Sequence, residues 1–191
     1  MSLEELVVKA RSYRRFAEPQ RLERKTLEFL VNVARRVPSA GNRQPLRYLL
    51  LHEAEACARM FPYLRWAGAL KDWGGPKEGE RPAAYIIVLT DTDVSREAEC
   101  DAGIAAQTIQ LAAAERGFGM CMLGAIERPK IQAEFKVPER YQIVLVLALG
   151  VPAEKIVLEE APASGDVTYY RDAHDVHHVP KRMLKDIVLG D

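Results

Sequence analysis

The sequence has few cysteines and no excess of charge of either sign. Its three cysteines, Cys57, Cys100 and Cys121, are odd in number, lie far apart and form no Cys-x-x-Cys pair. This pattern argues against a disulfide framework and makes a reducing cytoplasm the expected compartment. Lys and Arg together number 27, as do Asp and Glu, so the formal net charge is zero. The basic excess typical of proteins that bind nucleic acids or membrane surfaces is therefore absent.

Long hydrophobic segments are also missing from the sequence. Residues 1–10, MSLEELVVKA, lack a basic start followed by a long apolar run, so we expect no signal peptide. The longest apolar run, residues 143–149, is too short to span a bilayer. There is no internal repeat and no low-complexity tract. We therefore expect one domain over residues 1–191, a length that supports a hydrophobic core of its own.

The strongest predicted element is an alanine-rich helix over residues 98–114. This segment contains no proline and no β-branched run, which favours a helix. Its apolar and small residues go nearly all round the helix, a pattern typical of a helix that is buried on every side. Asp101, Gln107 and Gln110 are the polar exceptions and need partners if they are buried. Gly117 is expected to end the helix in a left-handed cap.

The rest of the pattern predicts helices and apolar strands in a mixed order. Apolar residues spaced i, i+3, i+4 and i+7 favour helices, and short apolar runs bounded by turn residues favour strands. The predicted helices cover residues 2–10, 21–37, 53–60 and 131–135, and the predicted strands cover residues 46–51, 83–90, 120–123 and 142–150.

Two segments lie outside this regular pattern. The loop at 61–82 contains Trp66 and Trp73, and it fits equally a lid over a pocket or a loop pinned by its aromatic side chains. After Pro152 the chain is polar and extended, which indicates an arm over residues 152–191 rather than a second domain. An apolar helix is predicted within this arm, at 183–189.

Basic residues gather near both ends of the chain. Arg11, Ser12 and Arg14 lie within four residues of one another and could hold a phosphate, because guanidinium groups form forked, charge-assisted hydrogen bonds. A solvated basic turn after a helix is the simpler interpretation of this cluster. Lys181 and Arg182 form a second basic pair at the far end of the chain.

A polar loop at 38–45 joins a predicted helix to a predicted strand. It reads Pro-Ser-Ala-Gly-Asn-Arg-Gln-Pro, with short hydrogen-bonding side chains between two prolines. Ser39, Asn42 and Gln44 would suit a flat heterocycle that needs donors and acceptors. An ordinary polar loop is the alternative.

Three histidines in the arm suggest a metal site by composition alone. His174, His177 and His178 lie beside Asp172 and Asp175. Their spacing matches no strong metal-binding motif, so we expect no metal ion here.

Four segments, in this order, resemble the FMN-dependent nitroreductase family. They are the Arg-Ser-x-Arg-Arg-Phe turn at 11–16, the Pro-Ser-Ala-Gly-Asn-x-Gln-Pro loop at 38–45, the alanine-rich helix that runs into Gly-x-Gly and Leu123-Gly124, and the strand that ends Leu149-Gly150-Val151-Pro152. The late Lys181-Arg182 pair completes the set. The resemblance spans nearly the whole chain, and the 38–45 loop is its most specific part.

The resemblance implies an α+β fold, with a central mixed β-sheet flanked by helices, that forms a homodimer with FMN in clefts between the subunits. It assigns the FMN phosphate to Arg11, Ser12 and Arg14, joined by Lys181 or Arg182. It implies that the loop of Pro38, Ser39, Asn42 and Gln44 reaches the flavin from the partner subunit, and that the backbone at Leu123 and Gly124 passes near the flavin ring.

The resemblance also implies an oxidoreductase. NADH or NADPH would reduce FMN, which would reduce a nitroaromatic, a quinone or a related small acceptor by a ping-pong mechanism. The flavin carries such chemistry, so the protein mainly binds, orients and stabilises charge, and the catalytic side chains stay unassigned. Arg14 is the first choice for a cation that stabilises charge on the ring, and Arg43 is the second. A more specific flavin reaction, such as dehalogenation or flavin breakdown, and a non-catalytic flavin-binding protein are the alternatives.

Overall fold

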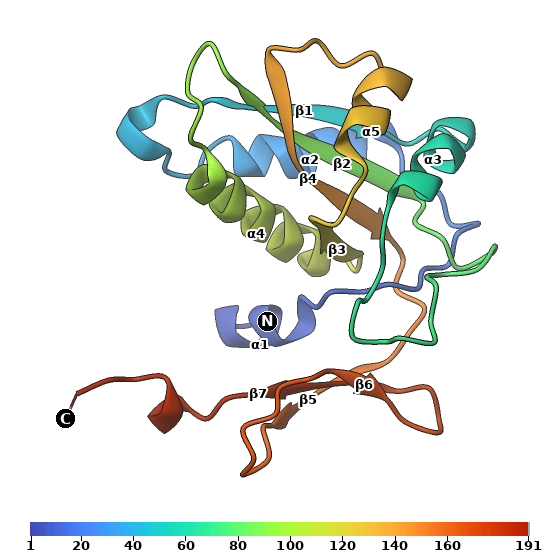
Figure 1. The fold of residues 1–191 in the computed structure, drawn as a ribbon, viewed down its shortest axis with the longest axis vertical. Coiled ribbons are helices and arrows are strands. Elements are labelled where there is room, and N and C mark those ends of the chain that lie inside the picture. The colour runs from blue at the N-terminus through green and yellow to red at the C-terminus, as the bar shows by residue number, and fades with distance from the viewer. Residues whose placement is uncertain (191) are drawn as a thin grey trace.

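The computed structural model describes residues 1–190 and has an α+β fold, as the resemblance implies (Figure 1). A four-stranded sheet lies between two layers of helices. A second, three-stranded sheet formed by the arm lies apart from the first and below helix α1 (Leu3–Lys9). In the described part of the chain, no helix is both long and apolar enough to cross a membrane.

The main sheet has the strand order β1-β2-β4-β3, and all neighbours in it are antiparallel. An isolated parallel bridge between Ser12 and Met120 adds a pairing of the opposite sense at the edge of β3, so the sheet is mixed at this edge. The sequence predicted all four strands to within one residue at each end. They are β1 (Leu46–Leu51), β2 (Ala84–Asp91), β3 (Gly119–Leu123) and β4 (Tyr141–Gly150).

Both faces of the main sheet are covered, which explains why β2 is apolar along most of its length. Ile86 and Leu147 point to one face and pack with α2 (Arg24–Ala34) and α4 (Glu99–Glu115). Tyr85 and Val146 point to the other face. There they pack with residues of two short helices, α3 (Ala54–Met60) and α5 (Arg128–Glu134). Alternate residues of a strand therefore enter two separate cores.

Helix α4 is the predicted alanine-rich helix, displaced by one residue. Gly117 ends it with φ +82°, and the amide of Phe118 donates to the carbonyl of Ala113 at 2.9 Å, so the predicted left-handed cap is confirmed. The prediction of burial on every side is wrong for the single chain. Ile104, with 37% of its surface exposed, lies with Gly103 on an uncovered face of the helix.

Two glycines that face each other in the β3–β4 pairing bring the 11–16 segment against the sheet. A Cβ atom on Gly119 would lie 2.8 Å from the ring of Tyr13, and one on Gly150 would lie 2.8 Å from the ring of Phe16. Any side chain at these positions would push the segment away. The two glycines therefore position the basic cluster that begins at Arg11.

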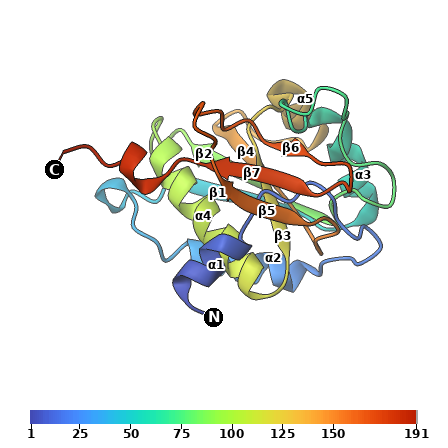
Figure 2. The same cartoon turned by 90° about the horizontal axis from the view of Figure 1, so that it is seen from below.

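The arm forms a sheet with the strand order β5-β7-β6, seen from below in Figure 2. Strands β5 (Ile156–Glu160) and β7 (His177–Lys181) are parallel, and β6 (Tyr170–Arg171) pairs antiparallel with β7.

The helix predicted at 183–189 is wrong. The segment has only a 3₁₀ turn, Leu184–Asp186, and Ile187 and Leu189 are exposed. A helix of seven residues with no core beside it gains too little to form.

Candidate functional site

Four of the predicted cofactor-binding residues line one cavity of about 250 Å³. They are Arg11, Ser12, Arg14 and Lys181, from opposite ends of the chain. None of the cavity's lining residues is acidic, so three cations face it without a carboxylate among them. The Nε atom of Arg11 is buried and has no hydrogen-bond partner in the structure. A cavity with three cations and an unpartnered buried donor suits an anion such as a phosphate.

Strand β7 explains why Lys181 reaches this cavity and its neighbour Arg182 does not. His177, Val179 and Lys181 all line the cavity, and they are alternate residues of one strand. Side chains two apart in a strand share a face. Arg182 follows the end of β7, is exposed, and is not among the lining residues. Of the predicted basic pair, only Lys181 therefore lies at the cavity.

Arg14 lies between this cavity and a second one. The second cavity, of about 210 Å³, is lined by Arg14 together with Leu123 and Gly124, the predicted ring-binding backbone. The Arg14 Nη1 atom lies 3.3 Å from the carbonyl oxygen of Ser12 and 3.3 Å from Nε2 of His177. The guanidinium also stacks over the ring of Tyr169, 4.8 Å from its centroid.

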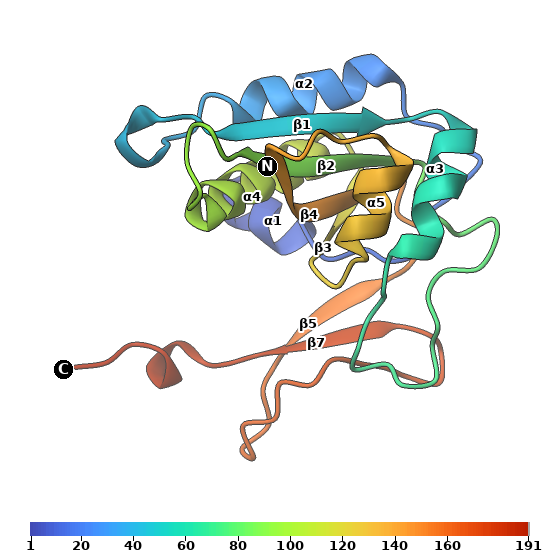
Figure 3. The same ribbon diagram turned by 45° about the horizontal axis from the view of Figure 1, so that its top comes forward.

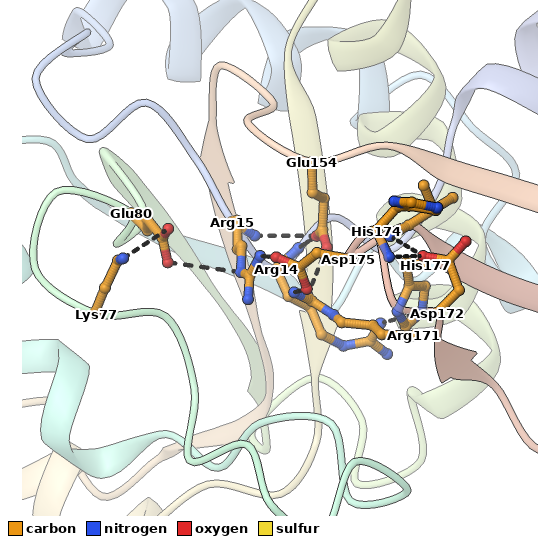
Figure 4. A network of polar contacts seen from close by, with 11 residues as sticks. Arg14, Arg15, Lys77, Glu80, Glu154, Arg171, Asp172, His174, Asp175 and His177 are labelled. Atoms are coloured by element: carbon orange, nitrogen blue, oxygen red, sulfur yellow. Dashed lines mark hydrogen bonds and ion pairs between the residues drawn. The ribbon is translucent and has the colours of Figure 1, made fainter.

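A buried carboxylate fixes the backbone beside Arg14 (Figure 4). Only 2% of the Glu154 side chain is exposed. It accepts hydrogen bonds from the amides of Arg14 and Arg15, the latter at 3.0 Å, and it pairs with Arg171 Nη2 at 2.7 Å. One carboxylate thus joins the N-terminal segment to the arm. The sequence held no signal for this role, because Glu154 follows a proline-containing turn with no motif around it.

The 61–82 loop runs down from the body of the protein to the arm (Figure 3). The Trp73 ring lies near two guanidinium groups, 5.8 Å from Arg15 and 4.7 Å from Arg171. Trp66 is buried and stacks with Phe61 at 6.0 Å, and it also lines the second cavity. The aromatic side chains of the loop therefore hold it in place beside a cavity, and its action as a lid stays a prediction.

The three histidines of the arm have three different surroundings. His174 is exposed. His178 lies 3.0 Å from a Glu159 oxygen and 3.2 Å from an Asp172 oxygen, and these carboxylates raise its pKa. His177 is 1% exposed, and burial, with the charges of Arg14, Arg171 and His178 in that order, lowers its pKa to about 4. Within residues 1–190, no group of three or more His, Cys, Asp or Glu side chains is arranged to hold a metal ion.

The 38–45 loop lines a separate cavity of about 150 Å³, on a different part of the chain from Arg14. Asp101 of helix α4 holds this loop, accepting hydrogen bonds from the Ser39 hydroxyl and from the amide of Ala40 at 3.1 Å. The amide of Gln44 donates to the same hydroxyl at 2.9 Å. Asp101 thus finds the partners that a buried carboxylate needs.

The polar tip of the loop is also structured from within. Gln44 Nε2 donates to Asn42 Oδ1 at 3.0 Å, and both residues have positive φ, near 50°. Pro38 borders the separate cavity. Arg43, the second choice for a stabilising cation, lines neither of the two cavities beside Arg14.

The chain resembles known proteins in both sequence and fold. YodC of Bacillus subtilis, which is named for NAD(P)H nitroreductase activity, is 23% identical over 75% of this chain and 87% of its own length. A protein of Archaeoglobus fulgidus, named for NADH dehydrogenase or NAD(P)H nitroreductase activity, is 26% identical over 82% of this chain and 88% of its own.

Solved structures share the fold at low identity. A nitroreductase family protein of Streptococcus pneumoniae has a TM-score of 0.70 and 16% identity, over 89% of this chain and all of its own. A structure from Exiguobacterium sibiricum, described as a nitroreductase in complex with FMN, has a TM-score of 0.68 and 18% identity, over 81% of this chain and 90% of its own. The model of the Nitroreductase family matches residues 7–151. The chain therefore belongs to the Nitroreductase family.

Proposed function

We propose that this protein is an FMN-dependent oxidoreductase that takes hydride from NADH or NADPH and reduces a nitroaromatic, a quinone or a related small acceptor. The observation that carries the proposal is the meeting of Arg11, Ser12, Arg14 and Lys181 in one cavity, next to a second cavity bordered by Leu123 and Gly124. Two relatives named for NAD(P)H nitroreductase activity and a structural neighbour described with FMN support the same assignment.

Each part of the site has a role toward FMN. Arg11, Ser12, Arg14 and Lys181 hold the phosphate through charge-assisted hydrogen bonds. The Leu123–Gly124 backbone borders the space for the ring. When bound, FMN would supply the redox chemistry, namely hydride transfer and electron transfer. Arg14 lines both cavities, so its guanidinium serves the phosphate and also stabilises negative charge on the ring side.

The working unit in this proposal is a homodimer. In the single chain, the 38–45 loop lines a different cavity from Arg14. A second subunit would bring its own Ser39, Asn42 and Gln44 to the flavin cleft. The uncovered face of α4 at Gly103 and Ile104 and the exposed Val8 of α1 give a dimer an apolar surface to cover. Sedimentation should show a dimer when flavin is bound, and a monomer with full flavin occupancy would contradict this part of the proposal.

The cofactor itself gives the most direct test. Flavin released by heat from the purified protein, or from protein reconstituted with FMN, should have the mass of FMN. Anaerobic addition of NADH or NADPH should then bleach the flavin absorbance, and an added quinone or nitroaromatic should restore it. Recovery of FAD, or no flavin even after FMN is added, would exclude the proposed cofactor. Bound FMN that neither pyridine nucleotide reduces would indicate a non-catalytic flavin-binding protein.

A further inference from the structure

His177 contacts Arg14 in a way that determines which of its ring nitrogens carries the proton. Its Nε2 atom lies 3.3 Å from Arg14 Nη1. A guanidinium has only donors, so Nε2 must accept and the proton of a neutral ring must sit on Nδ1. The neutral form is the one present near pH 7, since the pKa of this imidazole is lowered to about 4. The ring is therefore a fixed acceptor aimed at Arg14.

Arg14 is held from three directions. Its guanidinium meets the carbonyl of Ser12, the acceptor nitrogen of His177 and the face of the Tyr169 ring. These contacts use Nη1 and one face of the group, and they leave the N–H donors of Nη2 and Nε for a ligand. An arginine ordered before its ligand arrives loses less conformational entropy on binding.

Two of these three contacts come from the arm. Tyr169 and His177 are 5.3 Å apart between ring centroids, and both line the cavity with Arg14 and Lys181. The Nδ1 atom of His177 is buried and has no hydrogen-bond partner, so the side-chain hydrogen bond that the structure shows for this histidine is the one between Nε2 and Arg14.

We propose that His177 is a positioning residue for the cofactor phosphate: by accepting the Arg14 N–H at Nε2, it aims the guanidinium into the cavity. This inference rests on the proposed binding of FMN. It assigns part of the cofactor site to the arm, because the His177 side chain contacts Arg14. His177 does not line the second cavity, which Leu123 and Gly124 border.

Two amide variants test whether a hydrogen-bond acceptor must lie at the position of the His177 Nε2 atom. In H177Q, an amide oxygen can reach the place of Nε2, whereas in H177N the shorter side chain ends near the place of Nδ1. Apoprotein of each variant is titrated with FMN and with riboflavin, which has the same ring but no phosphate. We expect H177N to raise the Kd for FMN about three- to tenfold, the worth of one hydrogen bond, and H177Q to stay near wild type. The Kd for oxidised riboflavin should be the same in all three proteins, because it has neither the phosphate nor the negative charge on the ring that Arg14 would stabilise.

A double-mutant cycle tests whether His177 acts through Arg14. In the R14A background, H177N should cause no further loss of FMN affinity. The inference is overturned if H177N leaves the Kd for FMN unchanged, if it weakens FMN and riboflavin equally, or if its effect persists in R14A.

A measurement on the wild-type protein needs no variant that might fail to fold. With ¹⁵N-labelled histidine, the chemical shifts of His177 should show the proton on Nδ1 and a bare Nε2 at pH 7. A proton on Nε2 would overturn the inference whatever the variants show. A wild type that binds neither FMN nor riboflavin would instead refute the proposed function, and the ¹⁵N result would still report on the contact with Arg14.

Discussion

Arg14 and Lys181 reach one cavity from opposite ends of the chain, while Arg182 lies outside it. At the scale of single residues, the structure thus gives Lys181 and Arg182 different surroundings, whereas the sequence alone could only treat them as one basic pair. The deciding factor is the two-residue period of β7, which directs His177 and Lys181 to the cavity.

Alanine substitution should therefore distinguish these residues. Arg14→Ala and Lys181→Ala each remove a charge-assisted hydrogen bond worth about 1.5–3 kcal/mol, so each should raise the Kd for FMN about ten- to a hundredfold. Arg182→Ala is the matched control, and its Kd should stay within about twofold of wild type. Equal effects of Lys181→Ala and Arg182→Ala would show that the phosphate does not occupy this cavity.

His177 should make stability depend on pH. Its folded pKa of about 4 lies below the ordinary value of 6.5, so the unfolded chain takes up the proton first as pH falls. The stabilisation is complete above pH 6.5 and is lost as pH falls toward 4. One pKa unit is worth about 1.4 kcal/mol, so His177 should remove about 2 kcal/mol from the free energy of unfolding by pH 5.

Urea unfolding of wild type and His177→Gln at pH 7 and pH 5 checks this expectation, with the variant losing less stability. The pKa shift of His178 has the opposite effect on stability and acts over a different pH range. Its raised pKa stabilises the fold below pH 6.5, and this contribution is lost as pH rises through the raised value. The same pH dependence in wild type and His177→Gln would contradict a neutral buried imidazole.

At the scale of elements, the sequence predicted those parts that pack against the main sheet. Strand β2 and helix α4 are recognisable from their continuous apolar residues, because both faces of β2 and most of α4 are buried, and the Gly117 cap follows from local backbone chemistry. The segment at 183–189 is apolar too, but nothing in the described structure packs on it, so its pattern predicted a helix that does not form.

The site was predictable only where a local motif carries it. The 11–14 and 38–45 segments have recognisable motifs. Asp101 and Glu154 hold these segments through contacts between residues distant in sequence, namely 101 with 39 and 154 with 14. His177 joins the site through the register of the arm sheet. Single-sequence patterns hold no information on such pairings.

The glycine pair at the β3–β4 edge gives a prediction at this scale. Gly119→Ala and Gly150→Ala each place a methyl group 2.8 Å from an aromatic ring, and such overpacking should lower the free energy of unfolding by about 1–3 kcal/mol. Gly124→Ala is the control, since no atom lies within 4 Å of its added methyl, and it should change stability by less than about 0.5 kcal/mol. Chemical denaturation measures all three, and full stability in Gly119→Ala and Gly150→Ala would show that the 11–16 segment does not lie against the sheet.

At the scale of the whole molecule, the cavity lined by Arg11 and Lys181 lies between the body and the arm, and the second cavity beside Arg14 is bordered by the 61–82 loop. A homodimer would add the 38–45 loop of the second subunit to this side. The flavin ring would then have one open face, and both substrates would have to use it.

Steady-state kinetics should therefore follow a ping-pong pattern. Hydride transfer requires close contact between donor and acceptor atoms, so a nicotinamide in the open cleft leaves no room for a flat acceptor. Double-reciprocal plots at several acceptor concentrations should be parallel. Substitution of Trp66, which lines the second cavity, should change acceptor preference more than substitution of Trp73, which contacts Arg15 and Arg171. Intersecting plots and a trapped ternary complex would show that two substrate sites exist.

Arg11 and Lys181 stand near opposite ends of the chain, yet they border one cavity. An anion held by both is a non-covalent link between distant segments, and because only the folded chain assembles this cavity, the bound anion stabilises the folded state over the unfolded chain. The exposed stretch at 162–168 lies between β5 and β6, where a protease could cut. Strand β7 would then be tied to the body only by its pairing with β5, by side-chain contacts and by the shared ligand. Nicked protein should stay whole while FMN is present and release its last strands when FMN is removed.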